Sequence, residues 1–138
     1  MKISAHIDNS QGKHTASVVT NGNARFVDIP AKEIGLGASV NGGELLFLAL
    51  ATCYCNDIYR EASKRGIAVK RVEVEVEGEF GAEGEPARNI TYTAKIAAEG
   101  SDAEIRDLMH HTDRVAEIQN TLRAQTAVIL TNIEILSQ

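Results

Sequence analysis

Two cysteines, Cys53 and Cys55, are the side chains of this sequence with the clearest capacity for chemistry. The surrounding pattern predicts a helix, in which two positions are about 200° apart around the axis. The two thiols therefore diverge, and we expect neither a disulfide between them nor joint binding of a metal. A thiol with an ordinary pKa of about 8.5 is mostly protonated at neutral pH. Cys53 lies mid-helix, so it would need a cation from elsewhere to become reactive.

A second interpretation of Cys53 stays open beside the reactive one. Free cysteine is among the most buried residue types and usually packs as a small hydrophobe. Histidine also binds metals, but His110 and His111 are adjacent, so their side chains point apart. They are more simply explained as residues at a surface or at a helix end. A metal site from Cys55 and one histidine lacks any recognisable spacing. We therefore expect no metal and no cofactor.

Glu44 lies at the start of the predicted helix, where the helix dipole favours a carboxylate. Nine positions separate it from Cys53, or about 180° around the axis. Glu44 cannot reach the Cys53 of its own helix, although it could reach one on a partner helix.

The bulk composition is that of one soluble domain, residues 1–138, with 43% hydrophobic and 24% charged residues. A net charge of −5 argues against nucleic acid and anionic membranes as partners, since both require a basic face. The start of the chain does not resemble a signal peptide, and the longest apolar run, residues 45–51, is too short to span a membrane. Two closely spaced, unpaired thiols suggest a reducing compartment, so we expect a cytoplasmic protein.

Periodicity predicts an α+β fold, largely antiparallel, around two helices. In the first half, short strands surround an Asn21-Gly22 turn, and a helix over residues 43–65 ends at Gly66. Residues 45–51 are apolar on every face, which predicts an obligate homodimer because one small chain cannot cover them. The second half of that helix is amphipathic, and five of its side chains are expected to be exposed: Asp57, Arg60, Glu61, Lys64 and Arg65.

The rest of the chain reads as a hairpin, a second helix and a last strand. Valine alternates with glutamate over residues 72–77, and a return strand places Ile90, Tyr92, Ala94 and Ile96 on the inner face. A capping box of Ser101 and Glu104 opens the second helix, which restarts near Thr112. Residues 126–136 are β-prone and are expected to close the sheet.

Residues 41–53, NGGELLFLALATC, resemble the central helix of the OsmC/Ohr proteins, and the likeness extends over nearly the whole chain. The resemblance implies an intertwined homodimer that reduces organic hydroperoxides with thiols. It matches Cys53 to the cysteine that attacks the peroxide. It matches Glu44 to the carboxylate of the broader OsmC-like group, whereas the stricter hydroperoxidase pattern has glutamate where this chain has Gly43.

The chain also departs from that pattern. The second, resolving cysteine should fall at Ala116, and the activating arginine should fall near Ser10. Four arginines could replace the missing one: Arg25, Arg60, Arg114 and Arg123. Arg60 is the simplest substitute, because seven positions place it on the same helical face as Cys53. Polar residues also gather over residues 112–120, where the resolving segment of the family lies.

Two functions follow from these residues, and a purely structural homodimer is a third possibility that stays open. The first is a thiol peroxidase that uses Cys53, Glu44 and Arg60, with a small-molecule hydroperoxide as substrate and a small external thiol as reductant. The alternative is a non-catalytic homodimer that binds a small apolar or acyl ligand between its subunits, with Cys53 lining the pocket.

Overall fold

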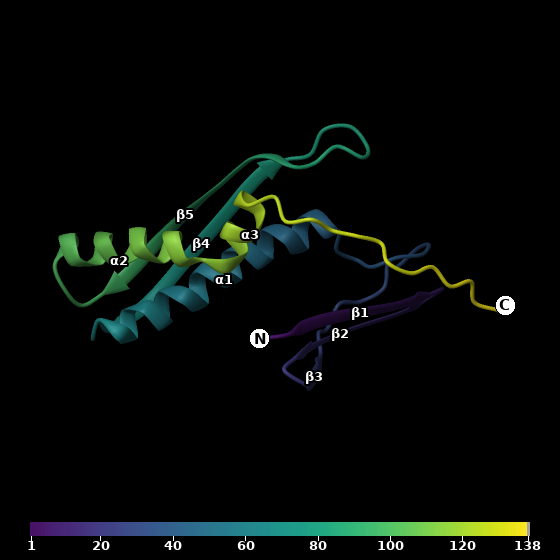
Figure 1. The fold of residues 1–138 in the computed structure, drawn as a ribbon, viewed down its shortest axis with the longest axis horizontal. Helices are drawn as coiled ribbons and strands as arrows, with labels where there is room; N and C mark the ends of the chain where they lie inside the picture. Colours follow the sequence, from purple (N-terminus) through teal and green to yellow (C-terminus); the bar gives the residue numbers. More distant parts are fainter. Residues whose placement is uncertain (138) are drawn as a thin grey trace. The chain divides into compact units, whose positions relative to one another are not determined.

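The computed structural model describes residues 1–137, which form an α+β fold of five strands and three helices (Figure 1). The predicted α+β class, with antiparallel strands, is therefore confirmed. The chain divides into two compact units, Met1–Leu46 and Phe47–Gln138. Among the described residues, no helix combines the length and apolar character that a membrane crossing needs.

The first unit contains a three-stranded antiparallel sheet in the order β1-β2-β3. Its strands are β1 (Ile3–Ser10), β2 (Lys13–Thr20) and β3 (Asn23–Phe26). The turn between β2 and β3 consists of Asn21 and Gly22, whose φ angles are 48° and 83°. Asparagine and glycine tolerate positive φ better than other residues, so the predicted hairpin forms at the predicted place.

Helix α1 (Gly42–Lys64) carries both cysteines and has a defined start and end. At its start, the backbone N–H of Glu44 donates to Oδ1 of Asn41 at 2.8 Å, and Oε1 of Glu44 accepts from the backbone N–H of Asn41 at 2.9 Å. At its end, Gly66 has a φ of 67°, and the N–H of Ile67 donates to the carbonyl of Ala62 at 3.0 Å. This glycine C-cap confirms the predicted end of the helix.

Strands β4 (Val69–Glu79) and β5 (Arg88–Ala98) form an antiparallel hairpin in the second unit. The valines of β4 lie on the packed face and its glutamates are exposed, as the alternation predicts. The packed face leaves little room at Gly78, where an added Cβ would lie 2.8 Å from Cζ of Phe47.

Helices α2 (Asp102–Val115) and α3 (Glu117–Arg123) follow the hairpin. The capping box of Ser101 and Glu104 is present at the start of α2. The second predicted helix was expected to restart near Thr112, but α2 continues to Val115 and ends at Ala116, which adopts φ −70° and ψ 111°. That backbone conformation is extended, so the helix cannot continue through it and α3 begins as a separate element.

The core of the second unit lies between the helices and one face of the β4–β5 hairpin (Figure 1). Four buried residues form its centre: Tyr54, Ile58 and Ala62 of α1, and Leu108 of α2. The inward side chains of both strands pack against them, including Val72 and Ile96. This packing fixes the orientation of the face of α1 that carries Cys53.

Residues 126–136 form no strand, which corrects the prediction that they close the sheet. Their apolar side chains are exposed instead, with Val128 at 98% and Ile135 at 94%. A strand needs backbone hydrogen bonds from a neighbouring strand, and none of the five strands pairs with this segment within the described residues. Residues 45–51 were expected to be covered fully only in a dimer, and in the single chain Leu48 is 61% exposed.

Candidate functional site

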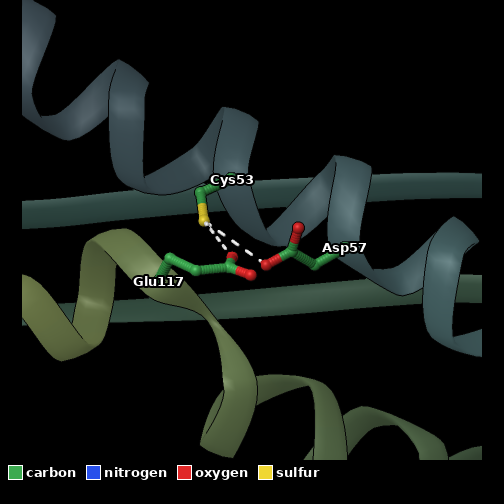
Figure 2. A group of neighbouring side chains, drawn as sticks. All are labelled: Cys53, Asp57 and Glu117. Atoms are coloured by element: carbon green, nitrogen blue, oxygen red, sulfur yellow. Dashed lines mark hydrogen bonds between the residues drawn. The ribbon is translucent and has the colours of Figure 1, made fainter. Parts of the chain in front are cut away.

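The thiol of Cys53 points toward two neighbouring carboxylates, those of Asp57 and Glu117 (Figure 2). Its Sγ donates to Oδ2 of Asp57 at 3.5 Å and to Oε2 of Glu117 at 3.8 Å. Both distances are within the range of a hydrogen bond that involves sulfur. The thiol has one proton, so the two carboxylates share it as acceptors.

Two separate elements bring these carboxylates to the thiol. Asp57 lies four positions after Cys53 on α1, one helical turn away on the same face. Glu117 is the first residue of α3, and it reaches Cys53 because the chain turns at Ala116. Their side chains differ in exposure, at 9% for Asp57 and 61% for Glu117.

Arg60 contacts the same two carboxylates from the other side. Its Nη1 lies 3.1 Å from Oδ1 of Asp57 and 3.0 Å from Oε1 of Glu117. These are not the oxygens that face Cys53. Among the described residues, the hydrogen bonds of Arg60 go to carboxylates and none goes to the Cys53 sulfur.

The surroundings of Cys53 favour its protonated form. Burial raises the pKa of the thiol, and the charge and hydrogen bond of Asp57 and the charge of Glu117 raise it further. The backbone hydrogen bond from Ile118 lowers it in part. Cys53 is therefore a thiol rather than a thiolate at neutral pH.

Asp57 and Glu117 titrate as a pair. Burial raises the pKa of Asp57 to about 6, and the hydrogen bond with Glu117 contributes in the same direction. That hydrogen bond, with Asp57 as its donor, lowers the pKa of Glu117. Near neutral pH, Asp57 can therefore both accept and release a proton beside the sulfur.

Glu61 anchors Arg60 to the rest of the unit. It accepts from Nε of Arg60 at 2.8 Å and from Nζ of Lys64 at 3.0 Å, and its other oxygen lies 2.9 Å from Nε2 of His111. These hydrogen bonds lower the pKa of Glu61 to about 2. Asp57 and Glu61 are 6% and 4% exposed, so the prediction that both face solvent was wrong. Carboxylates are buried here because each has charged partners.

The other residues singled out in the sequence lie elsewhere. Glu44 is engaged in the N-terminal cap of α1 with Asn41, and Cys55 is a free thiol two positions from Cys53. Ala116, at the place of the family's second cysteine, is fully buried. Ser10 is the last residue of β1 in the other unit. Of the predicted site residues, the structure brings Cys53 and Arg60 together, with carboxylates between them.

The sequence profile of the family described as OsmC-like protein matches residues 35–131. The chain belongs to this family. The resemblance noted in the cysteine-bearing helix is thus confirmed at the level of the family. No curated protein matches the chain.

Solved structures of OsmC-like proteins share the fold. An OsmC-like protein from Mycoplasma pneumoniae is 18% identical and superimposes with a TM-score of 0.61, covering 88% of this chain and 86% of its own. An OsmC-like hydroperoxide resistance protein from Jannaschia sp. CCS1 is 12% identical, with a TM-score of 0.55 and coverage of 96% and 91%. The organic hydroperoxide resistance protein OsmC from Legionella pneumophila is 18% identical, with a TM-score of 0.52 and coverage of 89% and 90%.

Two residues of this OsmC-like protein's site were not among the predicted ones. Asp57 had a usable signal, because a polar residue four positions from Cys53 on a helix shares its face. The sequence contains no comparable signal for Glu117. It lies in the polar segment 112–120 and directly follows Ala116, but only the backbone turn there directs it to the thiol.

Proposed function

We propose that this OsmC-like protein is a thiol-dependent peroxide reductase with Cys53 as its single reactive thiol. The observation that supports this most is the hydrogen bond from Cys53 to Asp57, a carboxylate whose pKa of about 6 suits it to proton transfer near neutral pH. Family membership points to the same chemistry, since two similar structures are named hydroperoxide resistance proteins.

The proposed first step is reduction of the hydroperoxide. Ionised Asp57 accepts the proton of the Cys53 thiol as the sulfur attacks the terminal oxygen of the hydroperoxide. The O–O bond breaks, and its electron pair leaves on the alkoxide oxygen. Asp57 then gives its proton to the alkoxide, which departs as an alcohol, and Cys53 becomes a sulfenic acid. This proton transfer compensates for a thiol whose own pKa is raised.

The second step requires a thiol from outside the chain. Cys55 is the only other cysteine, and it diverges from Cys53 on the same helix. A small thiol condenses with the sulfenic acid, forming a mixed disulfide and releasing water, and a second thiol regenerates Cys53 by exchange. Such a reductant is abundant in a reducing cytoplasm, the compartment that we infer from the unpaired cysteines.

Arg60 is proposed as a positioning residue rather than as the group that ionises Cys53. It contacts Oδ1 of Asp57 and Oε1 of Glu117 and so directs their other oxygens to the sulfur. The proposed working unit is a homodimer in which the Glu44 carboxylate of one subunit reaches the Cys53 thiol of the other. Mixed dimers of Glu44→Gln and Cys53→Ser chains should then retain one working site.

The decisive experiment separates thiol ionisation from proton transfer. In Asp57→Asn the thiol ionises more readily, so alkylation by iodoacetamide should speed up, while peroxide reduction slows because the proton acceptor is gone. Cys53→Ser should abolish peroxide consumption, and Cys55→Ser should retain most of it. Intact mass should show a sulfenic acid or a mixed disulfide on Cys53.

A different result would support the non-catalytic alternative. If Cys53 and Cys55 are oxidised at equal rates, no faster than a free thiol, the peroxidase proposal fails. Binding of a small apolar or acyl ligand between subunits would then be the better explanation of the fold.

A further inference from the structure

The three side chains around Cys53 have the spacing of a metal site. One donor atom from each of Cys53, Asp57 and Glu117 lies within 4.8 Å of the others. In a tetrahedral zinc site, with bonds of about 2.3 Å to sulfur and about 2.1 Å to oxygen, sulfur and oxygen are about 3.6 Å apart. The two sulfur–oxygen distances here are 3.5 and 3.8 Å. The two sulfur–oxygen distances therefore already fit one ion bound by all three side chains (Figure 2).

Arg60 leaves these donors available. It contacts Oδ1 of Asp57 and Oε1 of Glu117, whereas Oδ2 and Oε2 face the sulfur. An ion among the three donors would thus not have to displace Arg60. Groups that hold the far side of a ligating carboxylate in this way orient it and strengthen metal binding.

The negative charges of these three side chains also favour binding of a cation. Asp57 and Glu117 each place a carboxylate oxygen within 4.8 Å of the Cys53 sulfur. With Cys53 ionised, three negative groups would face a single arginine. A divalent cation can replace the thiol proton and offset the negative charge of both carboxylates.

We propose that Cys53, Asp57 and Glu117 bind one Zn²⁺ ion, with water as the fourth ligand. A thiolate donor favours zinc over magnesium or calcium, which prefer oxygen ligands in larger numbers. Binding releases the proton of Cys53 to solvent and covers its sulfur. The expectation of no metal rested on local spacing, and a third ligand 60 residues beyond Asp57 leaves no such spacing in the sequence.

The inference concerns the side chains of the proposed peroxidase but does not depend on that activity, because binding is measured without peroxide. Metal-free protein is titrated with Zn²⁺ in competition with a chromophoric chelator. We expect one ion per chain, with affinity that rises with pH as the thiol proton becomes easier to remove. With Cd²⁺ as a probe, an ultraviolet sulfur-to-metal charge-transfer band should appear.

Single substitutions test each ligand. Cys53→Ser and Glu117→Gln should each weaken Zn²⁺ binding by about tenfold or more, and Cys53→Ser should also remove the charge-transfer band. Cys55→Ser, the matched control, should bind as the unchanged protein does. The Glu117 side chain is 61% exposed, so its replacement leaves the core intact, and circular dichroism verifies folding of every variant.

Equal Zn²⁺ affinity in the unchanged protein and in Cys53→Ser would overturn the inference, as would loss of binding only in Cys55→Ser. Peroxide consumption by the metal-free protein is assayed in parallel. An active protein that binds no zinc refutes this site alone, and a zinc-binding protein without activity refutes only the proposed function.

Discussion

Arg60 and Cys53 contact opposite oxygens of the same carboxylate. Nη1 of Arg60 lies 3.0 Å from Oε1 of Glu117, and Sγ of Cys53 donates to Oε2 at 3.8 Å. The positive charge therefore reaches the thiol only across a negative group. This arrangement explains how the site can contain an arginine and still raise the pKa of its cysteine.

The first prediction concerns the pH dependence of Cys53. Its pKa is raised by burial and by Asp57, and the thiolate is the species that reacts with iodoacetamide. In the Cys55→Ser background, the alkylation rate should keep rising beyond pH of about 8.5, where an ordinary thiol is half ionised. A plateau below that pH would mean that a cation, not the carboxylates, dominates the site.

Glu117→Gln should make Cys53 more reactive. The substitution removes one of the charges that raise the thiol pKa, and each lowered pKa unit increases the thiolate population about tenfold. Because Glu117 is well exposed, we expect a gain of about two- to tenfold in alkylation rate at pH 7.5. Glu77→Gln, an exposed glutamate of β4, is the matched control and should change nothing.

Asp57→Asn should change how stability depends on pH. The folded pKa of Asp57 is about 6, above the value of about 3.9 for the unfolded chain. The unfolded state therefore loses this proton first, and the contribution of Asp57 to stability declines as pH rises through that window. Urea unfolding from pH 4 to 7.5 should show Asp57→Asn gaining free energy of unfolding, relative to the unchanged protein, up to about pH 6 and remaining level above it.

Ile58 should be the costliest single residue to truncate in the second unit. Its side chain, on α1, is fully buried and packs with Tyr54 and with Leu108 of α2. Ile58→Ala should lower the free energy of unfolding by about 2–5 kcal/mol, and Ile58→Val by about 0.5–1.5 kcal/mol. Chemical denaturation measures both. Equal, small losses of unfolding free energy in both variants would show that the surrounding side chains move in and fill the cavity.

Sedimentation at micromolar concentration should show about two chains per particle. The reason is apolar surface left open in the single chain, with Leu48 at 61% and Ile135 at 94% exposed. Side chains of this kind lower the free energy when a second copy covers them. A monomer that stays well folded at this concentration would contradict the prediction.

Locally encoded features of the fold were predictable from sequence. The Asn21-Gly22 turn depends only on residues that tolerate positive φ, and the Ser101–Glu104 capping box depends on side chains three positions apart. The segment 126–136 was predicted wrongly, because its composition suits a strand but pairing requires a neighbour from elsewhere. Glu117 beside Cys53 was missed for a related reason, since the turn at Ala116 has no local marker such as glycine or proline.

The unequal exposure of Asp57 and Glu117 gives Cys53 a time-dependent environment. Asp57 is enclosed, whereas Glu117 is held at the surface by an ion pair of a type worth about 0–1 kcal/mol. An exposed side chain so weakly held changes rotamer within picoseconds to nanoseconds. Alkylation takes far longer. Before it reacts, every Cys53 therefore experiences both arrangements, one with the Glu117 side chain beside the thiol and one with it turned away. Its kinetics should follow a single exponential whose rate constant is the population-weighted mean of a shielded and an open thiol.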